Sequence, residues 1–435
     1  MFNPEPLILN LLMKQILKKT ELKNGITILT DYMPHAYSVA VGAWIPRGSR
    51  HEAPDECGLS HFYEHLVFKG TQKRTALEIA RAIEDRGGNL EAYTTRQETG
   101  FYAQVESGDL PLAVDVITDM LMHPRLEKKE MEKERRVIIE EIHSYDDIPE
   151  ELVGDIFNAI HFKGSGIAHS ITGNVQQVKA LTHRQMLKYK QQVISQIPIF
   201  VCASGKVDHD TLVKLCKEKF AEKTIDGSYP TDIYKATQSV KVVQKQDITQ
   251  SNLFWGLSFD RNLMDDRDRA ALSMFNVAMG AGMASRLFQK IREEKGLAYS
   301  VYSTADIYRD CVDWGISLAT EPHQLNTALK ISVDETKKFL KRGFKAGEFE
   351  RTRANILGGM HLGADSPEKR LVRMAEQMLH LGEFRTMEKS EKILKSLTED
   401  EVVTTTNRLF NAAKFSAAVV EPKSKKKTAI DVNFF

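Results

Sequence analysis

Two histidines and a glutamate lie close together early in the chain, in the string His61-Phe-Tyr-Glu64-His65. In an α-helix, residues four positions apart share one face, so His61 and His65 can bind a single metal ion. Glu64 would then lie beside the metal, where a carboxylate can remove a proton from water. This order is the inverse of His-Glu-x-x-His, and it predicts a zinc hydrolase. The alternative is a solvated helix face that carries the three residues by chance.

A catalytic zinc usually takes three protein ligands, so a third must come from elsewhere in the chain. The helix predicted over residues 128–143 is rich in carboxylates. Its Glu134 and Glu141 are two turns apart and project from nearly the same face, whereas Glu140 points about 100° away from Glu141. Spacing alone therefore leaves open which glutamate binds the metal. It also leaves open a charged surface helix with no metal at all.

Length and composition limit the class of protein. The chain has 435 residues, which predicts two or more domains, and its hydrophobic content of 42% is that of a globular protein. A net charge of +1 gives no general attraction to nucleic acid or to an anionic membrane, so neither is expected as a partner. The apolar stretch 6–13 is too short to span a bilayer, and translation could start at Met1 or at Met13. The cysteines are scattered along the chain and form no Cys-x-x-Cys pair: Cys57, Cys202, Cys216 and Cys311. This pattern predicts reduced thiols in a cytoplasmic protein.

The sequence also repeats itself weakly. Glu132-Lys-Glu-Arg recurs as Glu348-Phe-Glu-Arg, Leu181-Thr recurs as Leu397-Thr, and the apolar segment at 200 recurs at 416, always 216 positions later. A duplicated domain explains the common spacing, and accidental register is the alternative. Short apolar strands alternate with amphipathic helices in each half, which predicts an α+β fold of two homologous domains, each a sheet covered by helices. We expect domains at 14–224 and 246–435 joined by a linker at 225–245 that contains Gly and Pro.

The combined motifs resemble the pitrilysin or insulinase family of zinc peptidases. Gly58-x-x-His61-x-x-Glu64-His65-x-x-Phe-x-Gly-Thr, with the downstream helix, is similar to the short members of the family, namely bacterial processing-type peptidases and the β subunit of the mitochondrial processing peptidase. The resemblance implies an antiparallel-rich sheet in each domain and a peptide chamber between them. It also implies one Zn²⁺ per chain, with Glu141, 76 positions past His65, as third ligand. Glu134 would orient the ligands by hydrogen bonding.

The resemblance extends to residues that would bind substrate. Arg292 and Tyr299 match a pair that contacts substrate at the zinc, and both side chains can donate hydrogen bonds to an oxyanion. The same segment can also be read as a packed helix followed by a turn. Glu91, Ala92 and Tyr93 match an edge strand that aligns substrate through backbone hydrogen bonds, although Glu91 stands where the family often has Asn.

Glu151 and Asp155, four positions apart on the next predicted helix, match acidic residues that receive a basic substrate side chain. Ordinary acidic residues near a helix N-terminus are the alternative reading. Together these features predict a zinc-dependent endopeptidase that cleaves peptides or extended unfolded segments. The resemblance to the short family members implies that it works as a homodimer. The alternative is a non-catalytic or partner-dependent subunit of a processing-peptidase-like complex. The sequence does not identify the physiological substrate.

Overall fold

The computed structural model describes residues 15–225, 233–424 and 428–430, so the two candidate start methionines lie outside the described residues. The strands are β1 (Ile16–Glu21), β2 (Ile26–Tyr32), β3 (Ser38–Ile45), β4 (Asn89–Thr94), β5 (Thr99–Glu106), β6 (Ile199–Gly205), β7 (Ser239–Lys245), β8 (Ser251–Asp260), β9 (Ala298–Ile307), β10 (Cys311–Thr320) and β11 (Lys414–Pro422). The helices are α2 (Leu59–Val67), α3 (Ala76–Glu84), α4 (Leu110–Met122), α5 (Lys128–Asp146), α6 (Pro149–His161), α7 (Val175–Ala180), α8 (His183–Ser195), α9 (His209–Lys219), α10 (Asp266–Gly280), α11 (Leu325–Arg342), α12 (Glu348–Ala364), α13 (Pro367–Leu381), α14 (Met387–Ser396) and α15 (Glu399–Asn411). No helix in the described part of the chain is both long and apolar enough to cross a membrane.

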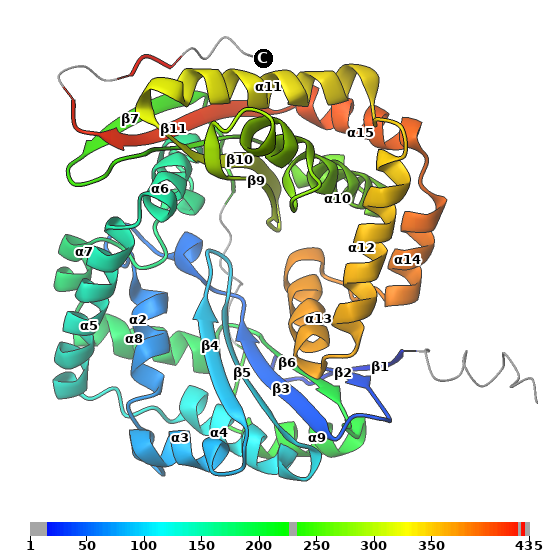
Figure 1. The fold of residues 1–435 in the computed structure, drawn as a ribbon. Coiled ribbons are helices and arrows are strands. Elements are labelled where there is room, and N and C mark those ends of the chain that lie inside the picture. Colours follow the sequence, from blue (N-terminus) through cyan, green and yellow to red (C-terminus); the bar gives the residue numbers. More distant parts are fainter. Residues whose placement is uncertain (1–14, 226–232, 425–427, 431–435) are drawn as a thin grey trace, which may run out of the picture. The chain divides into compact units, whose positions relative to one another are not determined.

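The strands form two sheets with the same connectivity (Figure 1). The first has the order β1-β2-β6-β3-β5-β4 and the second β7-β11-β8-β10-β9, which repeats the first without a counterpart of β1. In each sheet one pair is parallel, β2 with β6 and β7 with β11, and the other neighbours are antiparallel. The predicted duplication and the α+β fold class are therefore confirmed.

The repeated Leu-Thr pair has a local cause. Thr182 caps α8, where its side chain accepts the N–H of Gln185, and Thr398 caps α15, where it accepts the N–H of Glu401. In both helices the residue three positions on bonds back to the N-cap backbone, which completes a capping box. The repeat in the sequence is thus the start signal of equivalent helices.

The described residues divide into two compact units that do not follow the halves of the sequence in simple order. Unit 1 comprises the described residues of 1–139, 171–231 and 361–389, and unit 2 comprises those of 140–170, 232–360 and 390–435. The expected ranges 14–224 and 246–435 therefore differ from the units of the structure. Unit 1 includes residues 361–389 from the second half of the sequence, and unit 2 includes residues 140–170 from the first half. The expected linker also needs correction, since its end forms β7 (Ser239–Lys245).

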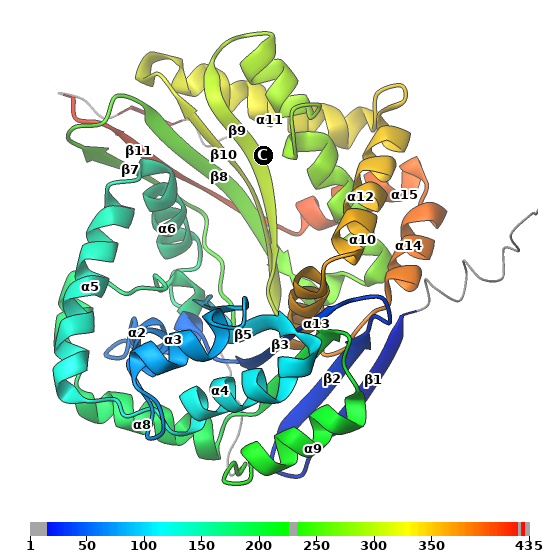
Figure 2. The same cartoon turned by 60° about the horizontal axis from the view of Figure 1, so that its bottom comes forward.

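The exchanged segments each supply a helix that covers one face of a sheet. In unit 1, α13 packs on β3 and β6 through a cluster that includes Trp44 and Met374, while α3, α4 and α9 cover the other face (Figure 2). In unit 2, α6 packs on β8 and β11, where Phe157 contacts Phe254. Because successive strand residues point to opposite faces, both faces of each sheet need an apolar cover.

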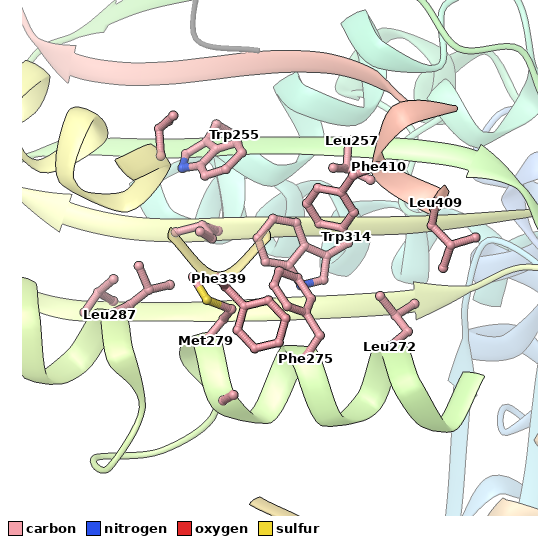
Figure 3. Packing of buried hydrophobic residues seen from close by; sticks show 14 of the residues in the cluster. Trp255, Leu257, Leu272, Phe275, Met279, Leu287, Trp314, Phe339, Leu409 and Phe410 are labelled. Atoms are coloured by element: carbon pink, nitrogen blue, oxygen red, sulfur yellow. The ribbon is translucent and has the colours of Figure 1, made fainter. Parts of the chain in front are cut away.

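The other face of the unit 2 sheet carries the large aromatic core (Figure 3). Trp314 of β10 packs against Phe275 of α10 and Phe410 of α15, and Phe275 also contacts Phe339 of α11. Trp314 is fully buried. This packing fixes β10 and its edge neighbour β9 against α10.

Candidate metal centre

Helix α2 begins at a sharply constrained backbone position. Gly58 caps it with φ of 87°, and a Cβ at this residue would lie 2.5 Å from the carbonyl oxygen of Thr172. The buried carboxylate of Glu52 accepts the N–H of Gly58 at 2.7 Å and that of Ser60 at 2.6 Å. Burial raises the pKa of Glu52 to about 7, against the lowering effect of these two donors. Glu52 thus binds the free N–H groups of the helix that carries the histidines.

The structure brings His61, His65 and Glu141 together. Each offers a ligand atom, and these atoms lie within 4.8 Å of one another. The imidazole rings are stacked edge to face with centroids 4.7 Å apart. Glu141 lies on the helix α5, which is continuous over Lys128–Asp146. Glu140, which helical spacing left open as a ligand, is not part of this group.

The donor set fits a zinc ion. Two imidazoles and a carboxylate are typical of a catalytic zinc site that keeps a fourth position open. With bonds of about 2.1 Å, ligand atoms around one ion lie roughly 3.4 Å apart, so small side-chain rotations bring the three atoms to a common ion. In the described part of the chain, no cysteine belongs to a group of this kind.

Glu134 is buried and contacts one of the two histidines. Its Oε2 atom is 3.2 Å from Nδ1 of His65, and its Oε1 atom is 2.8 Å from Nζ of Lys69. Because Nδ1 contacts the carboxylate, a metal ion would be bound through Nε2 of His65. The position of Glu134 therefore suits the orienting role that the resemblance implied. Lys69 was missed in the sequence because it lies just past the end of α2, where helical spacing gives no guide.

Glu64 is outside the metal-binding group but adjacent to it in the helix. Its Oε2 atom accepts a hydrogen bond of 2.5 Å from Oγ1 of Thr94, the last residue of β4. Sequence reasoning missed Thr94 as well. The only signal for it was strand alternation, which places Thr94 on the same face as Ala92.

Strand β4 is the last strand of its sheet, with β5 as its neighbour and no further strand in the described residues. Glu91 is exposed, whereas Ala92 and Tyr93 are half-buried. The hydroxyl of Tyr93 accepts a 2.9 Å hydrogen bond from Nε1 of Trp44, so its side chain faces the core under α13. The backbone of β4 is thus the part of this segment that could bind another strand.

Arg292 and Tyr299 both lie in unit 2 and contact one another. Arg292 lies in a π-helical turn (Phe288–Glu293), and its guanidinium is 4.7 Å from the ring centroids of Phe288 and Tyr299. Its Nη1 atom donates to the carbonyl of Tyr299 at 3.0 Å. Tyr299 is 76% exposed. Such π-helical turns occur often at functional sites.

Glu151 and Asp155 lie near the start of α6, in unit 2. Glu151 is exposed, and Asp155 accepts a 2.9 Å hydrogen bond from the hydroxyl of Ser170. The two residues share a helix face as expected from their spacing.

Comparison with known proteins identifies the family of the chain. Residues 27–175 match the family model described as "Insulinase (Peptidase family M16)", and residues 180–356 match "Peptidase M16 inactive domain". An uncharacterized zinc protease of Mycobacterium bovis is 32% identical over 416 residues, which cover 94% of each chain. An uncharacterized zinc protease of Bacillus subtilis is 30% identical over 94% of this chain and 98% of its own.

Solved structures agree with the fold. A protease from Helicobacter pylori superposes with a TM-score of 0.86 at 18% identity, covering 94% of this chain and 100% of that one. A peptidase M16 inactive domain from Pseudomonas fluorescens gives a TM-score of 0.85 at 16% identity, covering 96% of this chain and 100% of that one. The chain therefore belongs to the insulinase family of peptidases, family M16.

Proposed function

We propose that this protein is a zinc-dependent endopeptidase. One observation carries the proposal: three metal-binding side chains converge while a further carboxylate, Glu64, lies beside them and is held by Thr94 instead. A purely structural zinc site would fill its coordination with protein ligands and would need no adjacent base. The zinc proteases among the relatives support the same chemistry.

His61, His65 and Glu141 would hold the ion, and Glu134 keeps His65 in the orientation that its ligand role requires. When bound, zinc supplies a Lewis acid that polarises the scissile carbonyl and lowers the pKa of water. Glu64 removes the proton from the attacking water through its Oε1 atom and returns it to the leaving amine. We assign Arg292 and Tyr299 as donors to the oxyanion, because a guanidinium and a phenol can both hydrogen-bond to it.

The proposed substrates are peptides or unfolded segments in extended conformation. An extended chain can pair with the open edge of β4 through backbone hydrogen bonds, which tolerate many side chains. Glu151 and Asp155 would add a preference for Arg or Lys near the cleaved bond. Cleavage rates of matched peptides with arginine and with citrulline test this preference, and equal rates would remove it.

Digestion of a mixed peptide library, read by mass spectrometry, tests the activity itself. Wild-type protein loaded with zinc should cleave many peptides, and the chelator-treated protein should cleave none. Glu64→Gln should bind zinc normally and lose at least about 100-fold in kcat, since it removes the general base. Cleavage by Glu64→Gln at the wild-type rate would contradict the mechanism, and no cleavage by the wild type would contradict the function.

A non-catalytic or partner-dependent subunit is the second candidate, and the family model of an inactive domain over residues 180–356 favours it. The complete ligand set and Glu64 favour the active enzyme instead. We further propose that the active form is a homodimer. Light scattering after size exclusion gives the assembly state, and an assay of the same fraction shows whether the chain cleaves peptides without a different partner.

A further inference from the structure

We propose that Thr94 is the residue that positions the general base Glu64. Its hydroxyl lies 2.5 Å from Oε2 of Glu64, across the contact between β4 and α2. The assignment of Glu64 as base rests on the proposed function, whereas the hydrogen bond is a property of the fold. Both residues belong to unit 1.

The direction of the hydrogen bond follows from the neighbours of Thr94. Thr99 lies opposite in β5, with its hydroxyl 3.5 Å from that of Thr94, and it donates its own proton to the carbonyl of Arg47 at 3.0 Å. An ionised carboxylate can only accept. The proton of Thr94 therefore goes to Glu64, which is the nearer acceptor.

The hairpin around Thr94 holds its hydroxyl in a fixed position. On the following side, the N–H of Thr95 donates to the carbonyl of Glu98 at 2.8 Å, and Oγ1 of Thr95 accepts the N–H of Gln97 at 3.0 Å. On the preceding side, Tyr93 is anchored to Trp44 on the opposite face of the sheet. Because successive strand residues alternate faces, this anchor directs Thr94 toward α2.

The consequence for Glu64 is that one oxygen is occupied and the other is left to act. Oε2 accepts from Thr94, and Oε1 has no hydrogen bond to any other described residue. A base whose reactive oxygen is fixed before substrate arrives needs less reorganisation in the transition state. Since β4 is also the strand proposed to align substrate, the strand that binds the peptide would set the position of the base.

Steady-state kinetics of two substitutions test this role. Thr94→Val keeps the shape and removes the hydroxyl, and we expect kcat to fall at least about 10-fold while KM and zinc content change less than about 2-fold. Thr94→Ser keeps the hydroxyl and should restore kcat to within about 3-fold of wild type. An unchanged kcat in Thr94→Val would overturn the proposal, as would a Thr94→Ser variant as slow as Thr94→Val.

Thr304 provides the matched control. It lies in β9, the corresponding last strand of the second sheet, and is half-buried like Thr94. Thr304→Val makes the same chemical change at a hydroxyl that has no hydrogen bond to a carboxylate among the described residues. A fall in kcat equal to that of Thr94→Val would show a general effect of the substitution and would contradict the proposal.

Urea unfolding of the metal-free protein tests the bond without any activity. Thr94→Val should lower the unfolding midpoint in the wild-type background and change it less than a third as much in a Glu64→Ala background. Equal shifts in the two backgrounds would show that the bond is not formed. This measurement tests the hydrogen bond between Thr94 and Glu64 separately from the proposed peptidase function, because its outcome does not depend on whether the wild type cleaves peptides.

Discussion

Nδ1 of His65 lies 3.2 Å from Oε2 of the buried Glu134, and this contact determines which ring nitrogen can face a metal. The other oxygen of Glu134 is paired with Lys69 at 2.8 Å, so the carboxylate is not left as an isolated buried charge. The geometry of the candidate metal site thus depends on a residue that we do not expect to touch the metal.

Replacing Glu134 should weaken metal binding. Glu134→Ala removes the acceptor for His65 Nδ1, and the loss of such an orienting contact typically costs 10- to 100-fold in zinc affinity. Competition with a chromophoric chelator measures the change. Glu132→Ala on the same helix is the control, because its side chain is 66% exposed and pairs with Arg135, which is not a residue of the candidate metal site. Equal zinc affinities for Glu134→Ala and Glu132→Ala would show that Glu134 does not orient the ligand.

Replacing Glu52 should disturb the metal-binding helix at its start. Each carboxylate oxygen of Glu52 accepts one backbone N–H, from Gly58 or from Ser60. In Glu52→Gln one of these oxygens becomes an NH₂ group, which cannot accept, so one of the two hydrogen bonds is lost. The free energy of unfolding should fall by about 1–2 kcal/mol, the usual cost of a lost helix cap, and zinc affinity should fall with it. Glu78→Gln, which alters the capping box of α3, should leave zinc affinity unchanged. The idea fails if Glu52→Gln binds zinc like the wild type.

His161 should make unit 2 less stable in mild acid. It is buried between the hydroxyls of Ser416 and Ser258, and burial lowers its pKa to about 4. In the unfolded chain its pKa is about 6.5, so the unfolded state binds the proton first and stability falls as pH drops from 6.5 toward 4. Between pH 7.5 and 5 this single group should cost about 2 kcal/mol. Denaturant unfolding of the wild type and of His161→Gln at both pH values measures the free energies of unfolding. If this free energy falls equally in both proteins between pH 7.5 and pH 5, the pH dependence arises from other groups.

Weakening α13 should destabilise strands from the other half of the sequence. Met374 is fully buried against the cluster that includes Ala40 of β3 and Cys202 of β6. Met374→Ala should cost about 2–5 kcal/mol and raise the hydrogen exchange of β3 and β6. Leu362→Ala, at a side chain that is 78% exposed, serves as the control. Loss of protection confined to α13 itself would show that the helix does not stabilise the sheet.

Much of this protein could be predicted from local sequence. Helical spacing placed His61 and His65 on one face of a helix. The recurring Leu-Thr pairs marked the starts of equivalent helices in the two halves of a duplicated sequence. These features follow from the period of the helix and from capping, which act over a few residues. The domain ranges were less accurate, because α6 and α13 each complete the unit built mainly from the other half.

What local periodicity could not decide was which distant residues meet. Spacing left Glu134, Glu140 and Glu141 open as ligands, and the resemblance to a family selected Glu141. In the structure Glu141 is the glutamate that is grouped with the two histidines. Local sequence gave no sign that Thr94, Lys69 and Glu52 lie at the site. Thr94 lies at the end of a strand, Lys69 in a turn and Glu52 in a loop, and their contacts form only in the folded chain. Local sequence patterns were enough to predict the helix that carries the two histidines and the duplicated domain. The residues that orient the ligands and the base could be identified only in the folded chain, because hydrogen bonds between distant segments depend on how the chain packs and not on any local period.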